Sequence, residues 1–228
     1  MRAYQLPKGG AGIEALVQIE RPNPKPAYRQ VLVKVMACSL NFRDLGIVRG
    51  TYRMPVRDNI VPLSDGAGEV VEVGAGVTRV KTGDKVAGCF FQRWPGGEPP
   101  PDVQSGALGG GTDGMLAEYV VLEEEGVVKV PAHLSPEEGA TLPCAGVTVW
   151  HAMMEHARLV AGQTVLLQGT GGVSVFGPRP ASTAKPPRSN KATPTPERAP
   201  RSSRRASSRA SSCNPANRRN AAAIASAN

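Results

Sequence analysis

The 228-residue sequence predicts an α/β protein of the α+β type with three parts: a β-rich domain over residues 1–130, an incomplete α/β domain over 131–176, and a disordered tail over 177–228. Three observations carry this division. Valine alternates with other residues through much of the first part, a glycine-rich turn follows a short apolar run near residue 169, and the composition changes abruptly after Phe176. Periodicity and composition of these kinds separate strands, helices and unfolded segments.

Alternation with a period of two predicts strands in residues 1–40. It is clearest in QVLVKVMACSL, where Val31, Val33 and Val35 occupy every second position. Residues 66–88, GAGEVVEVGAGVTRVKTGDKVAG, alternate in the same way, and their glycines suit bends and tight turns. These runs predict a sheet with one buried face.

Two segments predict helices. Phe42, Leu45 and Val48 recur at three-residue spacing, which predicts a short amphipathic helix over 41–49 that Gly50 ends. The sequence Ser135-Pro136-Glu137-Glu138 combines an N-cap serine, a proline and acids, and predicts a helix running toward Cys144 and another from about Thr148.

The segment 92–114 is rich in glycine and proline and has no hydrophobic period, so we expect a long surface loop there. A loop of this length is often functional.

A strand followed by a glycine turn is expected near residue 164. The run TVLL, Thr164 to Leu167, precedes Gly169, Gly171 and Ser174, which match the spacing of a dinucleotide-binding turn. Serine at the third place weakens this match, and an ordinary glycine-rich turn is the alternative. The crossover helix, second strand and acidic residue that such a unit requires do not follow in the sequence.

The tail has a composition that cannot form a core. From Gly177 onward the chain carries eleven Lys and Arg against the single acid Glu197, and Ile224 is its only large apolar residue. Too little apolar surface is available to offset the ordering entropy, so we expect disorder. Arg, Pro, Ser and Ala have GC-rich codons, and our hypothesis is a frameshift near Phe176. A genuine basic tail that binds nucleic acid or anionic lipid is the alternative.

Charge and cysteine content restrict partners and compartment. The excess of positive charge lies wholly in the tail, and no aromatic residue is interleaved there for base stacking, so we do not expect a nucleic-acid partner. No apolar stretch approaches the roughly 20 residues that span a bilayer, and the start MRAYQLPKGG has no signal-peptide core. Four widely spaced cysteines form no CxxC pair. We expect a soluble, cytoplasmic protein.

The first 176 residues resemble the medium-chain dehydrogenase/reductase superfamily, in its zinc-free branch of quinone reductases and related alcohol dehydrogenases. The run Cys38-Ser39-Leu40-Asn41-Phe42-Arg43-Asp44 is similar to that branch's N-x-x-D segment, while SDGAGEVVEVGAGV, TGDKVAG and GTGGVS are similar to its glycine-rich segments. The resemblance implies a GroES-like β-barrel domain over 1–130, then linker helices and the first strand and turn of a Rossmann domain over 131–176.

The resemblance also bears on metal. Zinc-bearing relatives place a cysteine and a histidine where this chain has Asn41 and Ser64, and only Cys144 matches a family ligand position. Catalytic zinc needs three protein ligands, so we predict no metal. We interpret Cys144 as a small buried residue in preference to a reactive thiol. The three histidines, His133, His151 and His156, have no partner at ligand spacing.

By resemblance, the activity is hydride transfer between NAD(P) and a quinone, an enone, or an alcohol or carbonyl compound. Asn41 would lie near the nicotinamide ribose and Tyr52 would line the substrate pocket. The cofactor-binding residues would be Thr148, Gly169, Gly171, Gly172, Val173 and Ser174. Each also has a structural interpretation: Asn41 or Thr148 as a helix cap, and Tyr52 as packing.

We expect the chain itself to be inactive, because its cofactor domain is incomplete. The resemblance implies a small-molecule substrate, and it implies homo-oligomers among intact relatives, an assembly that the short second domain places in doubt here. The alternative function is a non-catalytic scaffold or nucleic-acid-binding module that uses the basic tail.

Overall fold

The computed structural model describes residues 1–7 and 12–178. Apart from Gly177 and Pro178, the predicted tail lies outside the described residues. The chain divides into two compact units, the first unit from Met1 to Thr148 and the second unit from Val149 onward. Each unit is described by itself below.

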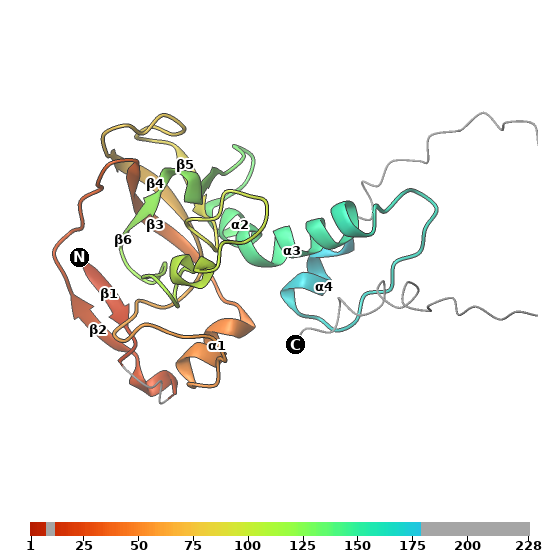
Figure 1. The fold of residues 1–228 in the computed structure, drawn as a ribbon, viewed down its shortest axis with the longest axis horizontal. Coiled ribbons are helices and arrows are strands. Elements are labelled where there is room, and N and C mark those ends of the chain that lie inside the picture. The colour runs from red at the N-terminus through yellow and green to blue at the C-terminus, as the bar shows by residue number, and fades with distance from the viewer. Residues whose placement is uncertain (8–11, 179–228) are drawn as a thin grey trace, which may run out of the picture. The chain divides into compact units, whose positions relative to one another are not determined.

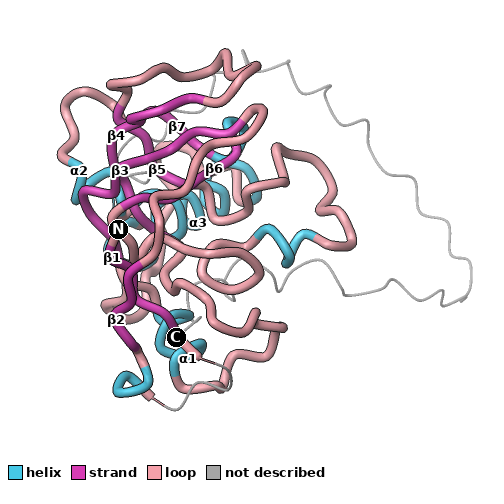
Figure 2. The backbone as a smooth tube through the Cα atoms, turned by 90° about the vertical axis from the view of Figure 1, so that its left-hand side faces the viewer, coloured by secondary structure: helices cyan, strands magenta, loops and turns pink. Residues whose placement is uncertain are grey.

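The first unit is built on antiparallel sheet (Figures 1 and 2). Its main sheet has the strand order β6-β3-β4-β5-β7, and a separate two-stranded sheet pairs β1 with β2. The strands are β1 Arg2–Gln5, β2 Val17–Glu20, β3 Gln30–Ser39, β4 Asp65–Val73, β5 Lys85–Gly88, β6 Tyr119–Glu123 and β7 Val127–Lys129. The strands predicted in 1–40 and 66–88 are therefore confirmed, together with the predicted α+β class.

The main core cluster lies on the face of the main sheet that the alternation predicted, and a smaller cluster contains Ala67, Ala87 and Ala140. Val31 and Val33 of β3 and Val70 of β4 are completely buried and pack in one apolar cluster with Met115 and Leu122. Strands β3 and β4 pair over nearly their whole length, with bulges between Leu32 and Val33 and between Val35 and Ala37. A bulge bends a strand and increases its twist, which curls the sheet.

The helices begin where the sequence predicts. Helix α1 spans Phe42–Val48, and Gly50 follows it with a φ of 69°. Helix α2 spans Pro136–Ala140, and its N-terminus has a capping box: Ser135 Oγ accepts from Glu138 N at 3.2 Å while Ser135 N donates to Glu138 Oε2 at 2.9 Å.

The chain continues from α2 as wide, π-helical turns. These turns span Leu142–Gly146 and His151–His156, and they flank α3, Val147–Trp150. Single 3₁₀ turns occur at Ile13–Ala15, Val103–Gly106 and Glu124–Gly126.

The prediction of a surface loop over 92–114 is wrong for its second half. Residues around Trp94 to Pro101 are mostly exposed, but Gly106 to Gly110 are buried. Leu108 is 1% exposed and belongs to the core cluster, and bridges join Phe91 to Ala107 and Leu108 to Thr112. The glycines of this segment have no side chain that would collide with neighbouring backbone. A polar, glycine-rich segment can therefore enter the interior.

The predicted strand at Thr164–Leu167 is also not formed. Residues 163–168 have no strand pairing, and Leu166 is 77% exposed. A strand of a parallel sheet needs hydrogen-bonded neighbours, and the described residues supply none for this segment. The turn after it is formed: Gly169 has a φ of 78°, and the short helix α4 spans Gly172–Phe176.

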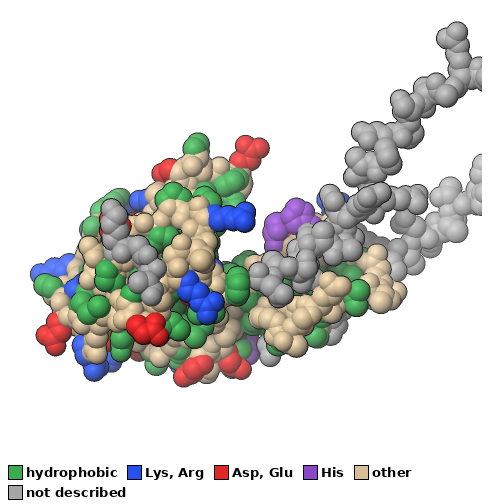
Figure 3. Space-filling model, turned by 90° about the horizontal axis from the view of Figure 1, so that it is seen from below, with side chains coloured by type: hydrophobic (Ala, Val, Ile, Leu, Met, Phe, Trp, Pro, Cys, Tyr) green, Lys and Arg blue, Asp and Glu red, His purple; other side chains and the backbone are tan. Residues whose placement is uncertain are grey.

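Charged side chains of both signs are interspersed on the face of the first unit seen in Figure 3. In the part of the chain that the structure describes, no helix is long and apolar enough to cross a membrane.

Candidate active site

Helix α1 holds three polar residues at the end of β3. Asn41 is its N-cap residue, and its backbone N–H donates to Asp44 Oδ2 at 2.8 Å. The structural interpretation of Asn41 as an N-cap residue therefore fits its position. Asp44 is 5% exposed, and burial raises the pKa of its carboxyl against the opposing effects of the Asn41 N–H and of Arg43.

Asp65, at the start of β4, lies in the same neighbourhood. It is 1% exposed; its Oδ1 accepts from Ser64 Oγ at 2.8 Å and its Oδ2 accepts from Cys144 N at 3.1 Å. Burial raises the pKa of this carboxyl, while Ser64, Asn41 and the Cys144 N–H act in the opposite direction. The carboxylate thus ties the turns after α2 to the sheet.

The backbone just before Asp65 is strained. Leu63 has a φ of 72°, in the left-handed region that costs a non-glycine residue roughly 1 to 3 kcal/mol. The strain is held by the backbone: Leu63 O accepts from Met115 N at 2.9 Å, and Pro62 O accepts from Leu116 N at 3.2 Å. Strand β4 is therefore entered at a fixed angle that directs Ser64 and Asp65.

Two thiols flank the carboxylates. Burial raises the pKa of Cys144 to about 11, and the negative charges of Asp65 and Asp44 add to this effect. The pKa of Cys38 is also raised to about 11, by burial first and then by Asp44 and Asp65. Cys38 Sγ also donates to Met115 O at 3.3 Å. Both thiols are protonated at neutral pH, which argues against a reactive thiol. Cys144 is half-buried, where the sequence predicted a buried residue.

Arg43 is the cation nearest to these groups. Its Nη1 donates to Leu108 O at 2.8 Å, and its guanidinium carbon lies 5.1 Å from the centre of the Tyr52 ring and 4.5 Å from that of Phe90. Tyr52, predicted to line the substrate pocket, thus contacts the charged group of this cluster. Cation–π contacts of this kind contribute roughly 0.5 to 2 kcal/mol each.

The cluster contains unpaired polar atoms. Among the described residues, the buried side-chain atoms without a hydrogen-bond partner are Asn41 Nδ2, Arg43 Nε, Arg43 Nη2 and Asp44 Oδ1. The Asn41 amide lies near enough to Asp65 to lower its pKa, without a hydrogen bond of regular geometry. All four atoms belong to one turn of chain.

The donor set of this cluster does not fit zinc. Asn41 and Ser64 are poor zinc ligands, and Ser64 Oγ donates to Asp65. The thiols of Cys38 and Cys144 are protonated at neutral pH, and the carboxyls of Asp44 and Asp65 already accept backbone hydrogen bonds. In the second unit the rings of His151 and His156 pack edge to face, with their centres 4.7 Å apart. No described group of three or more His, Cys, Asp or Glu side chains is arranged to hold a metal ion.

The predicted cofactor residues are not organised as a dinucleotide site by the described part of the chain. Thr148 is exposed and lies inside α3, so it does not cap a helix. Gly169, Gly171 and Gly172 are exposed, Val173 and Ser174 are half-buried, and Ser174 Oγ donates to Gln168 O at 2.6 Å. Among residues 1–7 and 12–178 no strand neighbours this turn and α4 has five residues, so the described chain does not complete the strand–turn–helix unit that holds a dinucleotide.

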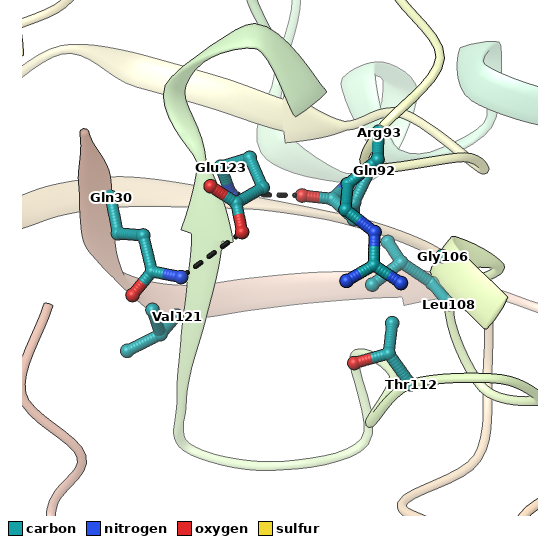
Figure 4. A pocket seen from close by; sticks show the side chains of 8 residues that line it. All are labelled: Gln30, Gln92, Arg93, Gly106, Leu108, Thr112, Val121 and Glu123. Carbon is teal, nitrogen blue, oxygen red and sulfur yellow. Dashed lines mark hydrogen bonds between the residues drawn. The ribbon is translucent and has the colours of Figure 1, made fainter. Parts of the chain in front are cut away.

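A small polar cavity of about 90 Å³ lies elsewhere in the first unit (Figure 4). Its polar groups largely satisfy one another: Gln30 Nε2 donates to Glu123 Oε1 at 3.0 Å, and Glu123 N donates to Gln92 Oε1 at 3.1 Å. None of the residues predicted for the site lines it.

Arg43, Asp65 and Phe90 were not predicted from the sequence as site residues. An arginine beside an aspartate on a short helix looks like a solvent-exposed pair, and only the burial of Asp44 and the approach of Leu108 make it an interior group. The signal available was the run of three polar residues, Asn41, Arg43 and Asp44, interrupted only by Phe42.

Known proteins resemble the first unit in sequence and in fold. Residues 27–132 match the family model described as the alcohol dehydrogenase GroES-like domain. The chain is 45% identical over 150 residues to a zinc-type alcohol dehydrogenase-like protein of Schizosaccharomyces pombe, an alignment that covers 64% of this chain and 43% of that protein. It is 36% identical over 173 residues to the chloroplast envelope quinone oxidoreductase homologue of Arabidopsis thaliana, covering 75% and 45%.

Solved structures give the same result. A thermostable alcohol dehydrogenase of Pyrobaculum aerophilum, with cobalt and zinc bound, superposes with a TM-score of 0.70 at 29% identity, covering 80% of this chain and 56% of that one. The chain spans less than half the length of the curated relatives cited above. Taken with the GroES-like domain and the shared sheet, these matches show that the chain belongs to the medium-chain dehydrogenase/reductase superfamily.

Proposed function

We propose that residues 1–148 form the substrate-side half of an NAD(P)-dependent, zinc-independent oxidoreductase, one that reduces a quinone, an enone or a carbonyl compound or oxidises an alcohol. The observation that carries this proposal is the cation in the cluster. Arg43 lies among two carboxyls and a thiol, at a place where Asn41, Ser64 and Cys144 offer too few ligands for zinc.

In this proposal the chain's own residues bind and orient the substrate. The Tyr52 ring forms one wall, Arg43 supplies fixed positive charge, and the Asn41 amide supplies an unpaired donor. NAD(P)H, when bound in an intact family member, supplies the hydride. Fixed donors placed where negative charge develops stabilise a transition state without reorganisation.

We also propose that this 228-residue chain does not itself turn over. The exposed glycine turn and the unpaired segment 163–168 support that view, since pyrophosphate binding depends on a strand and a full helix behind the turn. On this proposal the domain limits are 1–130 for the GroES-like domain and 131–176 for the incomplete second domain.

The substrate-side proposal is tested with a neutral alkene in the absence of cofactor. Binding of crotonamide to the intact chain is followed by ¹H–¹⁵N NMR, with Tyr52→Ala as the variant and Tyr28→Ala, an exposed tyrosine of the same unit, as the control. We expect shifts near residues 41–52 that Tyr52→Ala abolishes and Tyr28→Ala leaves unchanged. Shifts confined to other surfaces, or insensitive to Tyr52, would contradict the proposal.

A further inference from the structure

The unpaired atoms of the cluster need a partner. Asn41 Nδ2, Arg43 Nε, Arg43 Nη2 and Asp44 Oδ1 are shielded from solvent and make no hydrogen bond within the described residues. A buried polar group left unpaired is costly, and native proteins keep few of them. Three of the four are donors, and two belong to one guanidinium. The group that satisfies them must therefore be chiefly an acceptor.

The guanidinium is fixed in a way that leaves one edge free. Nη1 is occupied by Leu108 O, and the Tyr52 and Phe90 rings hold the group in place. The remaining atoms, Nε and Nη2, are the pair whose N–H bonds point in parallel from one side of a guanidinium. That edge matches the two oxygens of a carboxylate, which it binds bidentately.

The neighbouring carboxyls do not occupy this edge. Asp65 Oδ1 is engaged by Ser64 and Oδ2 by the Cys144 N–H, and Asp44 Oδ2 is engaged by the Asn41 N–H. Neither aspartate forms an ion pair with Arg43 among the described residues.

We propose that the Nε and Nη2 edge of Arg43 is a binding fork for the carboxylate of the substrate, so that the substrate is an unsaturated or carbonyl-containing carboxylic acid. This inference rests on the proposed function and names its substrate class. The fork is covered by Gly110, where any side chain would collide with Arg43 Nη2. The ligand gains access when Gly110 moves aside, while Leu108 O keeps its hydrogen bond to Nη1.

The test compares crotonate with crotonamide, which has the same shape and no charge. The intact chain is titrated with each while the Arg43 Nε–H signal is followed by ¹H–¹⁵N NMR. The variants are Arg43→Met, Arg43→Lys and Gly110→Ala, and the control is Gly171→Ala, where an added methyl group meets no atom. We expect crotonate to bind at least about tenfold more tightly than crotonamide and to shift the Arg43 Nε–H signal downfield, because charge-assisted bidentate hydrogen bonds are the stronger kind.

The variants separate a fork from a point charge. Arg43→Met and Gly110→Ala should abolish the preference for crotonate, Arg43→Lys should keep only a small part of it, and Gly171→Ala should leave it unchanged. Equal binding of both probes, with loss in Tyr52→Ala but not in Arg43→Met, would overturn the fork and leave the proposed function standing. Absence of Tyr52-dependent binding by either probe would overturn both. If the Arg43 Nε–H signal does not shift when crotonate is added, because a trapped water satisfies the group, the fork is also overturned.

Discussion

Replacing Arg43 by methionine should change the stability of the first unit by no more than about 2 kcal/mol, although the residue lies among buried groups. The loss has two parts. The hydrogen bond from Nη1 to Leu108 O is a bond to a charged group, worth about 1.5 to 3 kcal/mol. The two cation–π contacts, with Tyr52 and Phe90, contribute about 1 to 4 kcal/mol together.

The gain is of similar size. Removing the guanidinium also removes two buried N–H groups without partners, at about 1 to 3 kcal/mol each. Methionine keeps the unbranched stem between the two rings, so little packing is lost. The mid-range values of the loss and the gain, about 5 and about 4 kcal/mol, therefore nearly cancel, which is the pattern expected of a residue placed for binding and not for stability.

The assay is urea unfolding followed by fluorescence of Trp94, in a Trp150→Phe background so that only the first unit is observed. Met115→Ala is the matched core control: Met115 is completely buried, and its truncation should cost about 2 to 5 kcal/mol. A loss in Arg43→Met as large as that in Met115→Ala would show that Arg43 is a structural residue, contrary to this prediction.

Three further outcomes follow from the structure. Asp44→Asn should raise the free energy of unfolding at pH 7 to 8. Burial raises the pKa of Asp44 in the folded state, so the carboxyl stabilises the fold below its unfolded-state pKa. That stabilisation is lost as the pH rises through the folded-state pKa. The advantage of Asn over Asp should shrink in acid; an advantage that is independent of pH would contradict it. Cys144, with a pKa of about 11, should react with iodoacetamide at pH 8 far more slowly than a free thiol does. Mass spectrometry of the labelled peptide measures the rate, and labelling as fast as that of a free thiol would contradict the prediction. Gly68→Ala should cost at least about 1 to 3 kcal/mol, because its methyl group would strike Lys34 O on the paired strand, whereas Gly106→Ala meets nothing closer than 3.5 Å and should be tolerated in thermal melts.

The sequence predicted the sheet and the helix starts because those depend on local pattern. Val31 and Val33 alternate in a strand with one buried face, and Ser135 and Glu138 form their capping box without help from the rest of the chain. These features need no knowledge of which segments meet.

The features that sequence missed depend on contacts between distant segments. Leu108 is buried because Phe91 and Thr112 bring the glycine-rich segment back to the core, and its carbonyl then fixes Arg43 from 65 positions away. The strand expected at Thr164–Leu167 was wrong for the same reason, since an apolar run becomes a strand only when another strand pairs with it. Leu63 in the left-handed region gives no local sign, because leucine rarely adopts it.

We propose that residues 1–148 build the substrate side of an oxidoreductase, whereas the described residues of the second unit do not form a cofactor site. It is tested most directly by titrating the intact 228-residue chain with NADPH and with NADH, following nicotinamide fluorescence, and repeating the titration with Gly169→Val. We predict no saturable binding by either cofactor and no effect of the substitution. Saturation with a micromolar Kd that Gly169→Val abolishes would contradict the account.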